Sequence, residues 1–194
     1  MKWLHVLSTP LLTFYRTSAQ RGSLLEGLRG ILVHDHWVPY FKVKGVLHAM
    51  CNAHYFRELE ALAELDGETW ARAMQQLLRR ANRAVWIARE RGQALPRSLL
   101  EQVERRYDQL LREVLAHHQA LPALPSGRRG RKKRRPGHNL ALRLSERRAS
   151  VLRFLRDARV PFTNNQAEQD LRMMKLRMVR QANWARTGGA SPLW

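Results

Sequence analysis

The stretch ILVHDHW (residues 31–37) decides how the rest of the sequence is interpreted. Its apolar, partly β-branched beginning predicts a buried strand, and that strand would deliver an acid, Asp35, to its exposed end. The segment KGVLHAMC (44–51) predicts the next strand. From about Asn52 the apolar residues recur at helical spacing instead of in short runs. The sequence therefore predicts an α+β domain in which strands come first and helices interrupt them.

The residues before this strand predict a hairpin. KWLHVLST (2–9) and LLTFYRT (11–17) are short runs rich in apolar, β-branched and aromatic residues, and Pro10 separates them as a turn signal. SLLEGLRG (23–30) predicts a short amphipathic helix that ends at a glycine.

The residues after the strands predict helices around a basic arm. A long helical segment from about Asn52 is followed by a second from about Ser98 to His118. ALPALPSGRRGRKKRRPGHN (120–139) then brackets seven basic residues, among the eight from Arg128 to Arg135, with prolines and glycines. Like charges at that density repel and bury nothing, which predicts a loop. SERRASVLRFLRDARV (145–160) restores a helical pattern, and the final helix begins near Asn165.

The charge favours a polyanionic partner, above all nucleic acid. The chain of 194 residues has 35 Lys and Arg against 16 Asp and Glu, a formal net charge of +19. A membrane surface is disfavoured, because the basic residues are not confined to one amphipathic helix. A single cysteine permits no intrachain disulfide, and neither an uninterrupted signal-peptide core nor a spanning segment is present. The expected compartment is the cytoplasm.

The basic arm has three interpretations: a clamp on DNA phosphates, a solvated linker, or a localisation-like tract. The overall charge favours phosphate contacts, because each neutralised phosphate releases counterions. The candidate DNA-binding residues of the arm are Arg128, Arg129, Arg131, Lys132, Lys133, Arg134 and Arg135.

Two acids are candidate Mg²⁺ ligands, Asp35 at the end of a strand and Glu168 in the first turn of a helix. Hard carboxylate oxygens suit Mg²⁺, and two such ions could stabilise the attacking and leaving oxygens of phosphodiester displacement. Arg172 and Lys175 lie beside Glu168 on the helix and suit phosphate contacts. The competing interpretation of Glu168 is a helix cap, because Asn165 to Glu168 resembles a capping box. An ordinary ion pair with Arg172 also remains open.

Histidines near these acids suggest other sites. His34 and His36 would point away from Asp35 on a strand, so they are not expected to share one ion with it. Cys51 and His54 have the spacing of metal ligands, and His48 or His117 might complete a zinc site. The preferred interpretation is a buried thiol and a satisfied histidine where a strand meets a helix.

Four motifs together resemble the transposases of the insertion sequence 66 family: LVHDHWVPYF (32–41), CNAHYFRELEAL (51–62), GRRGRKKRRPGHNLALRL (127–144) and VPFTNNQAEQDLRMMKLRM (160–178). The resemblance implies a ribonuclease H-like core with an Asp-Asp-Glu triad, a helical insertion between its second and third acids, and Mg²⁺-dependent cutting and joining of DNA. By position Asp35 resembles the second acid and Glu168 the third. Cys51 and His54 are similar to a Cys-x-x-His element between those acids.

Two departures from the family accompany this resemblance. The first acid would precede the strand that resembles KWLHVLST, but no Asp or Glu occurs before Glu26. The tail VRQANWARTGGASPLW (179–194) shows no recognisable periodicity. We therefore expect a transposase truncated at its amino end and divergent at its carboxyl end, which binds DNA and cuts it slowly or not at all. The alternative is a non-catalytic DNA-binding remnant that interferes with a full-length transposase by mixed assembly; a homo-oligomer is also expected.

The expected organisation follows from the motifs. It comprises a first part of the catalytic core (1–54), a helical insertion (55–120), the basic arm (121–139), the remainder of the core (140–178) and the divergent tail (179–194).

Overall fold

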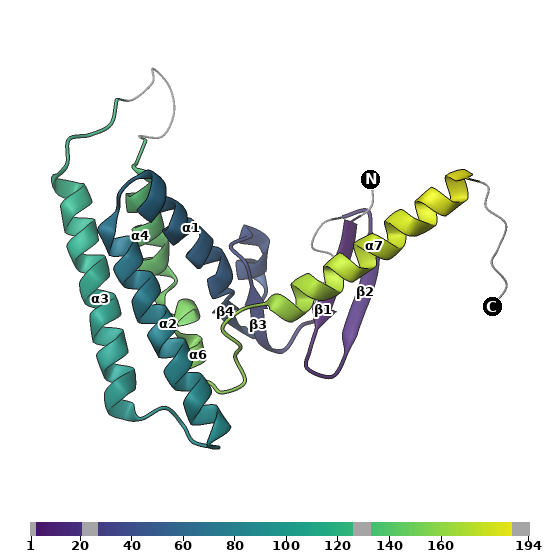
Figure 1. The fold of residues 1–194 in the computed structure, drawn as a ribbon, viewed down its shortest axis with the longest axis horizontal. Coiled ribbons are helices and arrows are strands. Elements are labelled where there is room, and N and C mark those ends of the chain that lie inside the picture. Colours follow the sequence, from purple (N-terminus) through teal and green to yellow (C-terminus); the bar gives the residue numbers. More distant parts are fainter. Residues whose placement is uncertain (1–2, 21–26, 126–132, 188–194) are drawn as a thin grey trace. The chain divides into compact units, whose positions relative to one another are not determined.

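Figure 1 shows the chain as a computed structural model, which describes residues 3–20, 27–125 and 133–187. The chain divides into two compact units. The larger unit runs from Arg29 to Thr163, and the smaller one combines the segments Met1–Leu28 and Asn164–Trp194.

The smaller unit contains the predicted hairpin and the last helix. Strand β1 (Trp3–Ser8) pairs antiparallel with β2 (Thr13–Ser18), with Trp3 opposite Ser18. Thr9 closes the turn: its N–H donates to the Leu12 carbonyl at 2.8 Å, and its hydroxyl oxygen accepts the Leu12 N–H at 2.9 Å. The hairpin prediction is therefore confirmed.

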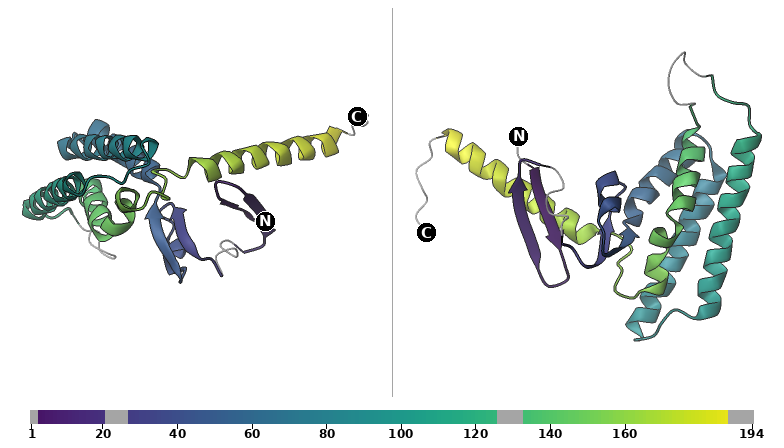
Figure 2. Two further views of the ribbon diagram at one scale, coloured as in Figure 1. Left: turned by 90° about the horizontal axis from the view of Figure 1, so that it is seen from below. Right: turned by 180° about the vertical axis from the view of Figure 1, so that it is seen from behind.

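One acid fixes helix α7 (Asn165–Thr187) against this hairpin. The Asp170 carboxylate accepts hydrogen bonds of 2.7 Å from the hydroxyls of Ser8 and Thr13, one at each side of the turn. The Tyr15 hydroxyl donates to the Asp170 carbonyl at 3.3 Å. These hydroxyl donors hold the pKa of Asp170 below its usual value, because they favour the charged carboxylate. Figure 2 shows α7 lying against the hairpin and crossing its strands obliquely.

The larger unit begins with a short parallel sheet. Strand β3 (Gly30–His34) pairs with β4 (Val46–Met50), with Gly30 opposite Val46 and His34 opposite Met50. The 3₁₀ helix η1 (Val38–Lys42) lies in the connection between them. The Cys51 N–H donates to the His34 carbonyl at 2.9 Å and extends the pairing by one residue. Both predicted strands are confirmed, and β3 ends immediately before Asp35.

Helices make up the rest of the larger unit, and Figure 1 shows α1, α2, α3 and α4 lying side by side as a bundle. A Schellman motif ends α2: Gly92 has a positive φ of 63°, its N–H donates to the Arg89 carbonyl, and the Gln93 N–H donates to the Ala88 carbonyl. The helices are α1 (Asn52–Leu65), α2 (Thr69–Glu90), α3 (Arg97–Ala120), α4 (Pro136–Glu146), α5 (Arg148–Val151) and α6 (Arg153–Arg156).

The apolar stripes of these helices meet in one core. Every fully buried apolar side chain of the described residues lies between Ala49 and Val160, inside the larger unit. Tyr107 is fully buried in this core, and its hydroxyl donates to the Leu144 carbonyl at 2.9 Å, so the buried polar atom is satisfied. The largest fully buried side chains include Tyr55, Tyr107, Phe154, Met50, Leu59, Met74 and Leu78.

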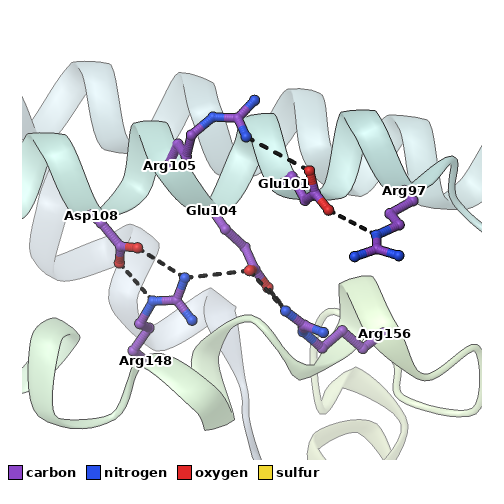
Figure 3. A network of polar contacts seen from close by, with 7 residues as sticks. All are labelled: Arg97, Glu101, Glu104, Arg105, Asp108, Arg148 and Arg156. Carbon is purple, nitrogen blue, oxygen red and sulfur yellow. Dashed lines mark hydrogen bonds and ion pairs between the residues drawn. The ribbon is translucent and has the colours of Figure 1, made fainter.

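Arginines connect the two short helices to α3, as Figure 3 shows. Arg148 donates to the Asp108 carboxylate at 2.6 and 2.9 Å, and Arg156 donates to the Glu104 carboxylate at 2.8 and 2.9 Å. The Glu104 carboxylate also lies 3.4 Å from the Arg148 guanidinium, so Glu104 pairs with one arginine from α5 and one from α6. The same carboxylates hold the pKa of Arg148 above its usual value, and the largest cause is the hydrogen bond that Arg148 donates to Asp108.

The α+β class is confirmed, and three details differ from the predictions. Helix α7 continues to Thr187, although the tail showed no periodicity. The apolar spacing of the final helix predicts a buried stripe of Ala167, Leu171, Met174 and Met178, but Met178 is 45% exposed and the other three are half-buried. Helix α4 begins at Pro136, inside the range expected for the arm. Of the helix predicted over 23–30, residues 23–26 lie outside the described residues, and residues 27–30 are not helical, because Gly27 has a positive φ of 74° and β3 begins at Gly30.

Two glutamates on α3 allow a matched test of the network in Figure 3. Glu104 is 12% exposed and binds arginines of α5 and α6, whereas Glu101 is 44% exposed and pairs with Arg97 and Arg105 on its own helix. We expect Glu104→Ala to lower the free energy of unfolding by about 1–3 kcal/mol, and Glu101→Ala by under about 1 kcal/mol. Urea unfolding measures both, and equal losses would show that Glu104 is not a tertiary connection.

Candidate functional site

Asp35 lies directly after β3, at the carboxyl end of the parallel pair. One of its carboxylate oxygens accepts the N–H of Trp37 at 2.9 Å, which fixes the orientation of the side chain. The other oxygen has no hydrogen-bond partner among the residues that the structure describes, and the side chain is partly exposed. A carboxylate with one oxygen fixed by the backbone and the other available suits a hard divalent cation such as Mg²⁺.

His34 supports the backbone of Asp35 from the buried side. Its ring is 2.6 Å from the Asp35 carbonyl through Nδ1 and 3.1 Å from Nδ1 of His48 through Nε2. Because a carbonyl only accepts, Nδ1 of His34 carries the proton and Nε2 accepts from His48. Burial lowers the pKa of His34 to about 4, so the ring is neutral at physiological pH.

His36 connects the Asp35 loop to the helices. Its Nε2 lies 3.7 Å from the Glu58 carboxylate of α1, and its ring contacts Tyr55 edge-on at 4.2 Å between centroids. Glu58 also accepts from Arg143 of α4. Burial lowers the pKa of His36, and Glu58 acts in the opposite sense. Sequence reasoning missed Glu58 and Arg143, because only the tertiary structure brings α1 and α4 to this loop.

Cys51 and His54 lie together at the start of α1. Cys51 is fully buried, and its sulfur lies within 4.8 Å of a ring nitrogen of His54. The histidines considered as further zinc ligands have other contacts, because His48 bonds to His34 and the ring of His117 contacts that of His118. The predicted buried thiol is confirmed, and zinc binding, the less favoured alternative, is untested.

Glu168 is the fourth residue of α7 and is partly exposed. Its N–H donates to the Asn164 carbonyl at 3.2 Å, an ordinary helical bond. A capping box from Asn165 to Glu168 would need Asn165 to precede the helix. Asn165 is instead the first residue of α7, so this interpretation is wrong by one position. Arg172 and Lys175 are exposed on the same helix, as expected for phosphate contacts. Asp35 and Glu168 belong to different compact units.

The basic arm is described only in part. Lys133 and Arg134 are exposed and Arg135 is half-buried, immediately before α4 begins. The other four candidates lie outside the described residues: Arg128, Arg129, Arg131 and Lys132.

Comparison with known protein families identifies the family of the chain. A family described as Transposase IS66 family matches residues 1–191 of the chain. The chain belongs to this transposase family. No curated protein and no solved structure matches it.

Membership of a transposase family agrees with the charge and with Asp35. It implies DNA binding, which suits the net charge of +19, and it suggests a divalent metal ion, which suits the fixed carboxylate. Among the helices in the described part of the transposase chain, none has the length and apolar character needed to cross a bilayer.

His34 gives a pH prediction for the folding of this transposase chain. The folded state holds its pKa near 4 against an ordinary 6.5, so the neutral ring stabilises the fold above pH 6.5, and this contribution is lost as the pH falls toward 4. Near His34 lie His48, Asp35 and His36, of which only Asp35 would favour a charged ring. The His34 contribution amounts to up to about 3 kcal/mol.

The measurement compares the free energy of unfolding of the wild type and His34→Gln between about pH 7 and pH 4. Acids that titrate in the same range act in both proteins, so the difference between the curves isolates His34. We expect the wild type to lose more stability than the variant as the pH falls. Parallel curves would contradict the assignment of His34 as a buried neutral ring.

Proposed function

We propose that the chain is the catalytic-domain part of a DNA transposase with a ribonuclease H-like core, in which Asp35 and Glu168 bind Mg²⁺. The family match supports the reaction class, DNA cutting and strand transfer. The observation that carries the assignment of Asp35 is its carboxylate at the end of β3, with one oxygen fixed by the Trp37 N–H. Glu168 is the acid in the first turn of α7, where basic neighbours follow it.

Each set of residues has its own task in this proposal. The bound ions would activate the attacking hydroxyl and stabilise the leaving 3′-oxygen. Asp35 holds its ligand oxygen in place through the Trp37 N–H, and His34 holds the Asp35 carbonyl from the buried side. Arg172, Lys175 and the basic arm neutralise phosphates and keep the DNA strand at the acids.

A shortage of acids limits the activity that we propose. Neither β1 nor β2 carries an Asp or Glu, so the proposal rests on two acids of this chain, Asp35 and Glu168. Two carboxylates bind two cations more weakly than three, because each ligand contributes charge and geometry. We therefore propose that the chain binds DNA and cuts it slowly. A second candidate function, a non-catalytic DNA-binding protein that joins mixed assemblies with an intact transposase, is favoured by the same shortage together with the basic residues.

Metal binding and cleavage test the two acids. We expect electron paramagnetic resonance to show weak Mn²⁺ binding that Asp35→Asn and Glu168→Gln each lower by about tenfold. Asp66→Asn is the matched control, because Asp66 is exposed at the end of α1, away from the β3 end. With either metal, nicking of labelled duplex DNA should stay near background. Efficient nicking that both substitutions abolish would contradict impairment, and Mn²⁺ binding unaffected by either substitution would contradict the metal site.

The arm has its own test. Neutralising Arg131, Lys132, Lys133 and Arg134 to Gln should weaken binding to every DNA sequence and flatten the dependence of log K on log salt by about one unit for each phosphate that is no longer neutralised. Fluorescence anisotropy over a salt series measures this. A variant with an unchanged salt slope would show that the arm is a linker and not a phosphate clamp.

A further inference from the structure

The outer face of α2 has an unusual composition. Arg72, Arg79, Arg83 and Trp86 are separated by steps of seven, four and three residues and share one side of the helix, with Arg80 beside them. All five are exposed, whereas the opposite side carries the buried stripe that includes Met74 and Leu78. We call these five residues the α2 stripe.

The charge of the α2 stripe is almost uncompensated. Helix α2 has no acid before its last residue, Glu90. Among the described residues, Arg72, Arg80 and Arg83 have no ion-pair partner. The side chain of Arg79 is 62% exposed, and its guanidinium lies 4.0 Å from the Glu60 carboxylate. On α3, by contrast, Glu101 lies within 4.0 Å of arginines on either side. The α2 stripe is therefore a concentrated positive surface that attracts anions.

Trp86 distinguishes the stripe from an ordinary solvated helix face. It is 59% exposed, and it is the one exposed large aromatic among the described residues of the larger unit. Trp70, on the same helix, is 9% exposed, so α2 buries one tryptophan and presents the other to solvent. Arginines that reach phosphates, next to an aromatic ring that can stack on a base, form the usual surface for single-stranded nucleic acid.

The charge also argues against other occupants. A second copy would bring its own arginines against these and would be repelled. A stacked base instead adds a flat apolar surface to Trp86 and a phosphate to its arginine neighbours. From Arg72 to Trp86 the helix rises about 21 Å, which matches about six base-pair steps of 3.4 Å.

We propose that the α2 stripe is a second DNA-binding surface, separate from the basic arm, on which Trp86 stacks on an unpaired base. The four arginines, which all precede Trp86 on the helix, hold the phosphates that lead away from that base on one side. A base inside a duplex offers no free face, so Trp86 would act only where a base has left the stack, as at a frayed or cut end. This inference rests on the proposed function in its choice of DNA as the ligand.

The experiment measures binding by fluorescence anisotropy to two DNAs, a fully paired duplex and the same duplex with one unpaired base. The triple substitution Arg72→Gln, Arg79→Gln and Arg83→Gln should weaken both and lower the salt slope by about 2–3 units. Trp86→Ala should weaken binding to the unpaired-base DNA by about tenfold and leave duplex binding within twofold.

Two control variants test whether the loss of binding comes from the α2 stripe itself. One lowers the net charge elsewhere, and the other removes an exposed apolar side chain elsewhere. Arg105→Gln, Arg106→Gln and Arg112→Gln remove the same charge from exposed positions of α3, and Leu65→Ala removes an 82% exposed apolar side chain from α1. Both controls should bind nearly as the wild type does.

Each outcome decides a different point. Equal losses from the α2 and α3 triple variants would overturn the α2 stripe as a specific surface, while DNA binding by the chain would stand. Equal effects of Trp86→Ala on both DNAs would overturn the stacking. If the wild type binds neither DNA, both this inference and the proposed function fail. If it binds DNA without detectable nicking, the inference is still fully tested.

Discussion

The parallel pairing of β3 with β4 is the constraint on which the larger unit depends. It places the two chain segments that follow these strands at one edge, so that Asp35 follows His34 there and α1 begins just after Met50. Asn52, at the start of α1, is fully buried and connects three segments: its side chain donates to the Val151 carbonyl and its N–H to the Phe162 carbonyl. A two-stranded ladder is marginal alone, so these polar contacts and the helical core must stabilise it.

Several acids of the chain connect segments that lie far apart in the sequence. Glu58 binds Arg143, Glu104 and Asp108 bind the arginines of the short helices, and Asp170 accepts hydroxyls from the hairpin. In each case the carboxylate joins segments far apart in the sequence. The net charge of +19 is therefore not spread evenly, because much of the negative charge is used between elements. On α2 the exposed arginines Arg72, Arg80 and Arg83 have no ion-pair partner among the described residues, so part of the positive charge is concentrated there.

Local sequence signals predicted the helices and strands, whereas contacts that depend on the tertiary structure were not predicted. The hairpin, both strands and the start of α7 follow from short apolar runs and turn residues, which are visible within a few positions. The extension of α7 to Thr187 was missed because a mostly polar segment shows no apolar period. The contacts of His36 with Glu58 and Tyr55 depend on α1 folding back onto the Asp35 loop, which no local pattern encodes. The exposure of Trp86 could have been predicted from the sequence, because Trp86 does not share the helical spacing of the buried residues of α2.

Binding and cleavage depend on the sequence in different ways, and this difference decides how the chain can function. Attraction to DNA is a sum over many cations, so losing one arginine weakens it by one increment. Metal-dependent cleavage needs a complete set of ligands in one geometry, so losing one acid removes most of the rate. This chain has arginines on α2, on α7 and before α4, whereas β1 and β2 carry no acid. It therefore keeps its attraction to DNA whether or not it cleaves DNA. DNA binding is thus the more robust of the two functions, and a surface that recognises unpaired bases would serve it with or without cleavage.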